Sequence, residues 1–198
     1  MKKLLTLLLL VPMIAHAEMA PDALIKDLAQ EVTTIIKQEK SKHSDKKALA
    51  EAVDAKIMPH FDFIRMTRLA VGRPWRDATP VQQQSLTQEF HTLLMNTYSS
   101  ALESYRNEPI EVQPLLAAPD AKQVMVHSRI IQNGKAPISI DYRMEKTAKG
   151  WMIFDVAVEG VSLVTNYRST FQTEISNSGI DGLIKLLADK NKTLEAKK

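Results

Sequence analysis

The sequence predicts an α+β fold in which a four-stranded antiparallel meander is wrapped by helices. Two observations carry this prediction. Apolar residues recur every three or four positions over residues 21–105 and again after residue 162, which is typical of amphipathic helices. Between residues 110 and 159 the apolar residues alternate instead, and short turns separate the alternating stretches. Short connections join antiparallel neighbours, so these strands are expected to follow one another across the sheet.

The first 17 residues have the form of a secretory signal peptide. Two lysines precede an apolar run over residues 4–14, and a small-x-small triplet suited to cleavage follows at residues 15–17. The apolar run is too short to span a bilayer. We therefore exclude residues 1–17 from the fold and expect residues 18–198 to form a single soluble domain.

Export and composition together indicate the compartment. The chain has no Cys, and Glu18 stands where a bacterial lipoprotein would carry its acylated Cys. We therefore expect an unanchored protein of the bacterial periplasm, stabilised by its core rather than by disulfides. Removing the two lysines of the signal peptide leaves 24 basic against 23 acidic residues. The lysines near the C-terminus are interleaved with acidic residues and are expected to form the solvated end of a helix. We therefore do not expect nucleic acid as a partner.

The helical part, residues 18–72, is expected to hold three helices, over 21–40, 45–57 and 61–71. Pro59 ends the second helix, and Gly72 closes the third. A long helix then begins at Pro80 and continues to about residue 105. Thr79 is its N-cap, and Gln82 completes a capping box.

The four strands are expected over residues 110–116, 123–132, 137–146 and 151–159. Pro114 places the first at an edge of the sheet, and Asn133-Gly134 predicts a hairpin between the second and third.

The last strand should place Met152, Phe154, Val156 and Val158 on one apolar face. A turn at Gly160 should then lead into helices over residues 163–179 and 181–190. The long helix, the sheet and these two helices form the second part of the single domain, residues 79–198. A twisted sheet of this size, curled around a long helix, has the shape of NTF2-like and cystatin-like folds.

Catalytic chemistry has weak support in the sequence. The histidines after residue 17 lie on separate elements without ligand spacing, and there is no GxSxG, GxGxxG or P-loop. Carboxylates on the polar strand face, Asp141, Glu145, Asp155 and Glu159, could perform acid–base work only inside an apolar pocket. Pairing of these carboxylates with Arg129 and Arg143 across the strands is the simpler interpretation. We expect no enzyme, no metal and no cofactor.

Three segments carry a resemblance to a known family. EGVSLVTNYRSTF (159–171), GIDGLI (179–184) and VGRPWRDATPVQQ (71–83) closely resemble the MlaC family. These are the toluene-tolerance auxiliary proteins of the Mla intermembrane phospholipid transport system. The similarity extends over essentially all of residues 18–198, although the helix over 21–40 carries little of the family signature.

The resemblance implies a soluble periplasmic carrier that holds phospholipid with its acyl chains buried. Such carriers maintain outer-membrane lipid asymmetry by moving lipid between an outer-membrane lipoprotein–porin complex and an inner-membrane ABC transporter complex with a hexameric substrate-binding subunit. The residues that would line the acyl pocket are Phe90, Leu94, Tyr98, Val156, Val158, Val161, Leu163, Val164, Tyr167 and Phe171. The candidates for meeting the lipid phosphate are Arg68, Arg73 and Arg168.

Plain core packing is the alternative for each of these apolar residues, and two other functions stay open. A small-molecule enzyme on an NTF2-like scaffold would need a carboxylate or His buried beside Val156 and Val158. A non-carrier interaction domain of the periplasm would have a filled core, whereas a carrier needs a cavity of the size of ligand sites or larger.

Overall fold

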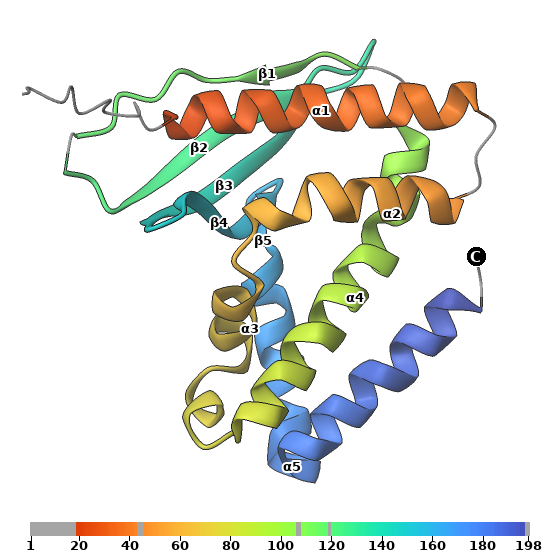
Figure 1. The fold of residues 1–198 in the computed structure, drawn as a ribbon, viewed down its shortest axis with the longest axis vertical. Coiled ribbons are helices and arrows are strands. Elements are labelled where there is room, and N and C mark those ends of the chain that lie inside the picture. The colour runs from red at the N-terminus through yellow and green to blue at the C-terminus, as the bar shows by residue number, and fades with distance from the viewer. Residues whose placement is uncertain (1–18, 43–45, 106–107, 119, 197–198) are drawn as a thin grey trace, which may run out of the picture.

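The computed structural model describes residues 19–42, 46–105, 108–118 and 120–196, so the predicted signal peptide lies outside the described residues (Figure 1). The helices are α1 (Pro21–Ser41), α2 (Lys46–Lys56), η1 (Met58–His60), α3 (Phe63–Val71), η2 (Arg73–Arg76), α4 (Pro80–Ser104) and α5 (Leu163–Glu195). The strands are β1 (Ile110–Val112), β2 (Gln123–Ile130), β3 (Ile138–Thr147), β4 (Gly150–Val158) and β5 (Val161–Ser162).

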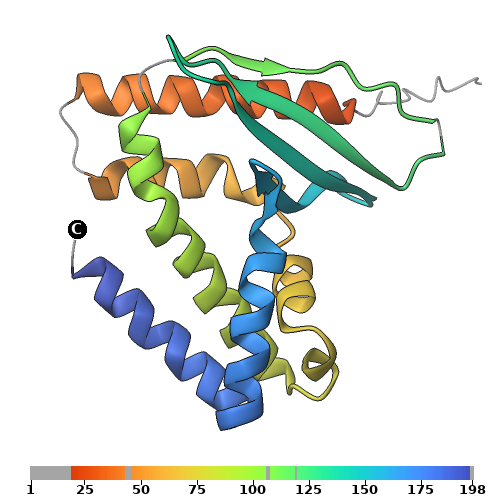
Figure 2. The same ribbon diagram turned by 180° about the vertical axis from the view of Figure 1, so that it is seen from behind.

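The helix that lies along the sheet is α1, whereas the long helix α4 extends away from it with α3 and α5 (Figures 1 and 2). Accordingly, α1 contacts β1, β2 and α2, and α4 packs against α5, α3 and α2. The expectation of a sheet curled around the long helix is therefore corrected. The stripe of α4 packs instead on aromatic residues of α5: the ring centroids of Phe90 and Phe171 are 5.2 Å apart.

The sheet is an antiparallel meander in the order β1-β2-β3-β4-β5, with five strands rather than the four that we predicted. The added strand follows a tight turn at Glu159 and Gly160, whose φ angles are 50° and 78°. Two consecutive positive φ angles are typical of a type I′ hairpin, which returns the chain to pair Val161 with Val158. At the other edge β1 ends at Val112, since Pro114 has no amide to donate.

A bulge in β4 contradicts the predicted alternation of its side chains. Asp155 pairs with Arg143 but Ile153 pairs with Met144, so Phe154 has no partner in the register. Ile153 is therefore fully buried in the core face, while Phe154 lies on the other face beneath the guanidinium of Arg65, 3.8 Å away. One extra residue in a strand moves the side chains that precede it to the opposite face of the sheet. The side chains of Phe154 and Met152 therefore lie on the face opposite that of Val156.

The residues predicted to cap the helix ends take that role in the structure. The Thr79 and Gln82 side chains form the predicted capping box at 3.2 and 2.9 Å, and the Ser162 hydroxyl accepts from the amide of Thr165. Gly72 and Gly179 have φ angles of 74° and 72°. At Gly179 the helical conformation is interrupted within α5, and the two halves of α5 (residues 163–178 and 180–195) run in different directions.

Buried side chains form two clusters. The sheet core joins α1, α2, β2, β3 and β4. The helical core joins α3, α4 and both halves of α5. None of the helices in the described residues combines the length and apolar character that crossing a bilayer requires.

Candidate functional site

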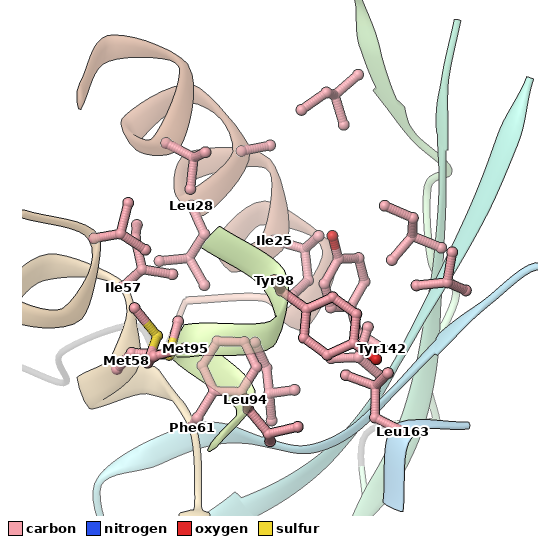
Figure 3. Close-up of a pocket in the computed structure, with 18 of the residues that line it drawn as sticks. Ile25, Leu28, Ile57, Met58, Phe61, Leu94, Met95, Tyr98, Tyr142 and Leu163 are labelled. Atoms are coloured by element: carbon pink, nitrogen blue, oxygen red, sulfur yellow. The ribbon is translucent and has the colours of Figure 1, made fainter. Parts of the chain in front are cut away.

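An apolar cavity of about 340 Å³ lies between α1, α2, the C-terminal half of α4 and the sheet. In Figure 3, Ile25 and Leu28 of α1, Leu94 of α4 and Tyr142 of β3 surround this space. The volume is within the range of about 300–1,000 Å³ of small-molecule sites. Its lining is aliphatic, Met and aromatic side chains, with the hydroxyls of three tyrosines as the polar groups.

Two regular patterns build the opposing walls. On α1, the residues Ile25, Ala29, Val32 and Ile36 recur every three or four positions and face the cavity together. On the sheet, Ile140 pairs with Val158 and Tyr142 pairs with Val156. Directly paired residues project from the same face, so these four side chains form one continuous wall.

Burial raises the pKa of two of the lining tyrosines, Tyr98 and Tyr142. Burial raises the pKa of Tyr142 above its usual value of 10.0 and outweighs a hydrogen bond with Ser128, which lowers it. The Tyr105 hydroxyl donates to the carbonyl of Glu108 at 2.5 Å. Burial raises the pKa of Tyr98 too, and the neighbouring phenol of Tyr167 raises it further.

Within the described part of the chain, the residues that line the cavity include no carboxylate, His, Lys or Arg. Among the described lining residues, the tyrosine hydroxyls are therefore the only side-chain groups that could take part in proton transfer. No cluster of three His, Asp or Glu placed to hold a metal ion occurs among the described residues.

The carboxylates of the polar strand face have partners outside the cavity. Asp141 meets His127 at 2.7 Å, Glu145 forms an ion pair with Arg65, and Asp155 lies 3.9 Å from Arg143. The expected interstrand pairing thus includes Arg143 with Asp155. Arg129 instead lies 3.8 Å from Glu111, across the β1–β2 pair.

Five of the ten predicted acyl-pocket residues line the cavity: Leu94, Tyr98, Val156, Val158 and Leu163. Four others belong to the helical core: Phe90, Val164, Tyr167 and Phe171. Val161 is 58% exposed at the sheet edge, where its pairing with Val158 places it beside the cavity.

Sequence reasoning missed the α1 wall and the two tyrosines Tyr105 and Tyr142 as lining residues. The signals are present in the sequence, because apolar residues recur every three or four positions over residues 21–40, and Tyr142 alternates with the apolar residues Ile138, Ile140 and Met144.

The three predicted head-group arginines are exposed, and none lines the cavity. Arg168 covers Gly72, since its guanidinium nitrogens lie 3.6 and 3.8 Å from the position of a Cβ on that residue.

A second hollow, of about 550 Å³, lies between α2, η1, α3 and the N-terminal half of α4. Met58 and Phe63 line both hollows and form the wall between them. The second hollow is more polar, because glutamines of α4 and an Asp54–His91 pair at 2.7 Å contribute to it. The first is the better candidate for an apolar ligand.

Comparison with known proteins gives a consistent result. The family model described as MlaC protein matches residues 26–189. The toluene tolerance protein ttg2D of Pseudomonas putida is 27% identical over 180 residues, which cover 90% of this chain and 83% of that protein. The intermembrane phospholipid transport system binding protein MlaC of Haemophilus influenzae is 26% identical over 179 residues, covering 88% and 84%.

Among solved structures, the chain is similar to a phospholipid-binding protein from Ralstonia solanacearum, determined in complex with a phospholipid. The TM-score is 0.81 at 36% sequence identity, and the match covers 88% of this chain and 98% of the other.

Proposed function

Because the chain belongs to the MlaC family, we propose that it is a phospholipid carrier whose apolar cavity holds acyl chains. The observation that carries the proposal is the cavity itself: about 340 Å³, bounded by aliphatic and aromatic side chains, with three tyrosine hydroxyls as its polar groups. We propose that residues 18–198 form the single lipid-binding domain.

The energetics of a lipid tail explain why such a cavity is useful. A chain of about 16 carbons gains roughly 12 kcal/mol on leaving water, at ~0.8 kcal/mol per methylene. Spontaneous escape into water is then very slow, so a carrier must keep the tail covered at all times. Burial alone achieves this, and no covalent chemistry is needed.

The names of the relatives support the wider role. One is called an intermembrane phospholipid transport system binding protein, and the Ralstonia protein was determined with a phospholipid. We propose that this chain works in the same kind of system in the periplasm, between an outer-membrane lipoprotein–porin complex and an inner-membrane ABC transporter complex with a hexameric substrate-binding subunit. Docking to each complex would let tails pass between apolar surfaces.

Within this proposal, the apolar residues of α1 that face the cavity contact the acyl chains from one wall. The chains are contacted from the other side by Leu94, Tyr98, Val158 and Leu163. The apolar lining favours a carrier over an enzyme, since the described lining residues include no carboxylate, His, Lys or Arg. The open volume favours a carrier over a domain with a filled core.

Filling the cavity tests the proposal. In Ala29→Trp an indole enters the space from α1, whereas Ala55→Trp places the same group on the exposed face of α2 as a matched control. Displacing only two methylenes of the lipid costs about 1.6 kcal/mol, or roughly fifteenfold in affinity.

Native mass spectrometry of gently purified protein is the measurement. We expect co-extracted phospholipid on the unsubstituted protein and on Ala55→Trp, and at least tenfold less on Ala29→Trp with an unchanged circular dichroism spectrum. Bare protein in every preparation of the unsubstituted chain, or equal loading of the two variants, would contradict the proposal.

A further inference from the structure

We propose that the Lys190 ammonium and the hydroxyls of Tyr98 and Tyr167 form a binding site for a phosphate group beside the apolar cavity. The inference rests on the proposed function, because the phosphate is taken to be that of the lipid whose tails occupy the cavity. Lys190 is not among the head-group candidates suggested by the sequence, which were Arg68, Arg73 and Arg168.

The cavity reaches the surface at Tyr98. This residue lines the cavity and is also 36% exposed, so its ring extends from the apolar interior towards solvent. Leu163 of α5 lines the same region, and Tyr167 follows one helical turn later on the same side of α5. A lipid whose tails lie against Leu163 would therefore have its polar end near these two phenols.

The ring of Tyr167 is held in place by buried aromatic neighbours. It packs edge-to-face on Phe90, with ring centroids 5.2 Å apart, and lies 5.6 Å from the ring of Phe171. Phe90 and Phe171 are almost fully buried, so they form a rigid support. Burial raises the pKa of Tyr98 above its usual value of 10.0, and the phenol of Tyr167 raises it further. Tyr98 therefore keeps its proton and can donate to an anion near neutral pH.

Lys190 reaches this site because α5 changes direction at Gly179. The φ of 72° at that residue interrupts the helix, and the second half of α5 returns along α4. The next residue, Asn191, is buried and anchors this half: its amide donates to the carbonyl and carboxylate of Glu89 at 2.9 and 2.8 Å. The Lys190 Nζ then lies 6.0 Å from the centroid of the Tyr167 ring.

The Lys190 ammonium has no carboxylate within 4.0 Å among the described residues, unlike Lys185, which pairs with Asp189 at 2.5 Å. Its distance from Tyr167 is at the outer limit of cation–π attraction, so that contact leaves the charge available. A phosphate oxygen would supply the missing partner through a charge-assisted hydrogen bond, and the phenols would donate to the remaining oxygens.

Two ligands with the same acyl chains, one with a phosphate group and one without, distinguish the contribution of the phosphate site to affinity from that of the cavity. Binding of a phosphatidylglycerol and of the diacylglycerol with the same acyl chains is measured for the full chain and its variants by competition with a fluorescent lipid. We expect Lys190→Ala to weaken phosphatidylglycerol about tenfold, the size of one charge-assisted hydrogen bond at a partly exposed site, and diacylglycerol less than twofold.

The controls are Lys192→Ala, an exposed neighbour on the same helix, and Lys190→Arg, which keeps the charge. Both should bind phosphatidylglycerol within about threefold of the unsubstituted protein. The tenfold difference should shrink at high salt, since the site is partly exposed.

Equal losses for the two lipids, or no loss in Lys190→Ala, would overturn this inference while leaving the carrier proposal intact. Failure of the unsubstituted protein to bind either lipid would overturn both. Tight binding of inorganic phosphate alone, abolished by Lys190→Ala, would assign the site to free phosphate and refute the lipid assignment.

Discussion

Replacement of Asp155 should destabilise the junction between the sheet and α5, the helix that carries part of the cavity wall. Its side chain is 2% exposed on β4, and its carboxylate accepts from the Ser162 hydroxyl at 2.7 Å and the Val164 amide at 3.2 Å. These donors belong to the first turn of α5 and to its N-cap, next to the cavity residue Leu163. One carboxylate therefore fixes where α5 begins relative to the sheet.

The magnitude follows from the bonds lost in Asp155→Ala. The buried Val164 amide is left without its partner, which costs about 1–3 kcal/mol, and the charged hydrogen bond from Ser162 contributes about 1.5 kcal/mol more. Loss of an anion near a helix N-terminus adds roughly 0.5 kcal/mol. Arg143 is half exposed and keeps its hydration, so its pairing adds little. Relief of the desolvation of the carboxylate offsets part of this, and we expect a net loss of about 3 kcal/mol.

Urea unfolding followed by circular dichroism measures the effect. With a slope of about 2 kcal/mol per molar urea, the midpoint should fall by about 1.5 M with the slope unchanged. Asp155→Asn retains one acceptor and should lose about half as much. Asp141→Ala, which removes a partly exposed pair with His127, should lose less than about 1 kcal/mol. A loss in Asp155→Ala no larger than that of Asp141→Ala would refute the reasoning.

Three further predictions concern the tyrosines, the break in α5 and the helical core. The raised pKa values of Tyr98 and Tyr142 mean that the native state retains protons that the unfolded state loses at about pH 10, so stability should fall as the pH rises above about 10; an unchanged slope of urea midpoint against pH in Tyr142→Phe would count against this. Gly179→Ala should cost about 1–3 kcal/mol in the same unfolding assay, because the φ of 72° and ψ of −174° at this residue lie in a region that essentially only Gly adopts, and nothing lies within 4 Å of the added Cβ; Gly179→Asn should lose about as much, and an unchanged midpoint in both variants would contradict this. Phe171→Ala should cost about 3–5 kcal/mol in thermal unfolding, because the ring packs in the helical core; a loss below about 1 kcal/mol would contradict that placement.

Features with local causes could be predicted from the sequence. The capping box at Thr79, the cap at Ser162 and the turn residues Gly72 and Gly160 each depend on residues within a few positions, and each takes its expected role. The order of the strands followed from their short connections in the same way. Alternation within a stretch and short turns suffice to define a meander.

Features with distant causes could not be predicted. The bulge at Phe154 accompanies a parallel bridge between Phe61 and Ile153, in which the Asp62 amide donates to the Ile153 carbonyl at 2.8 Å. Nothing in the strand sequence encodes a partner about 90 residues earlier.

The split of the candidate site has a similar origin. Phe90 and Leu94 lie one turn apart on α4 and share a stripe, yet Phe90 packs against α5 whereas Leu94 lines the cavity. Periodicity identifies a buried face but does not distinguish packed interior from a cavity. That distinction depends on how far the facing elements stand apart, which the tertiary fold decides.

A crystal structure of the full chain after incubation with a phospholipid would show whether the apolar cavity holds lipid. We expect continuous electron density for an acyl chain between α1 and the β3–β4 wall, in contact with Ile25 and Tyr142. Density for lipid elsewhere on the protein, or side chains that close this space completely in the presence of saturating lipid, would contradict this expectation.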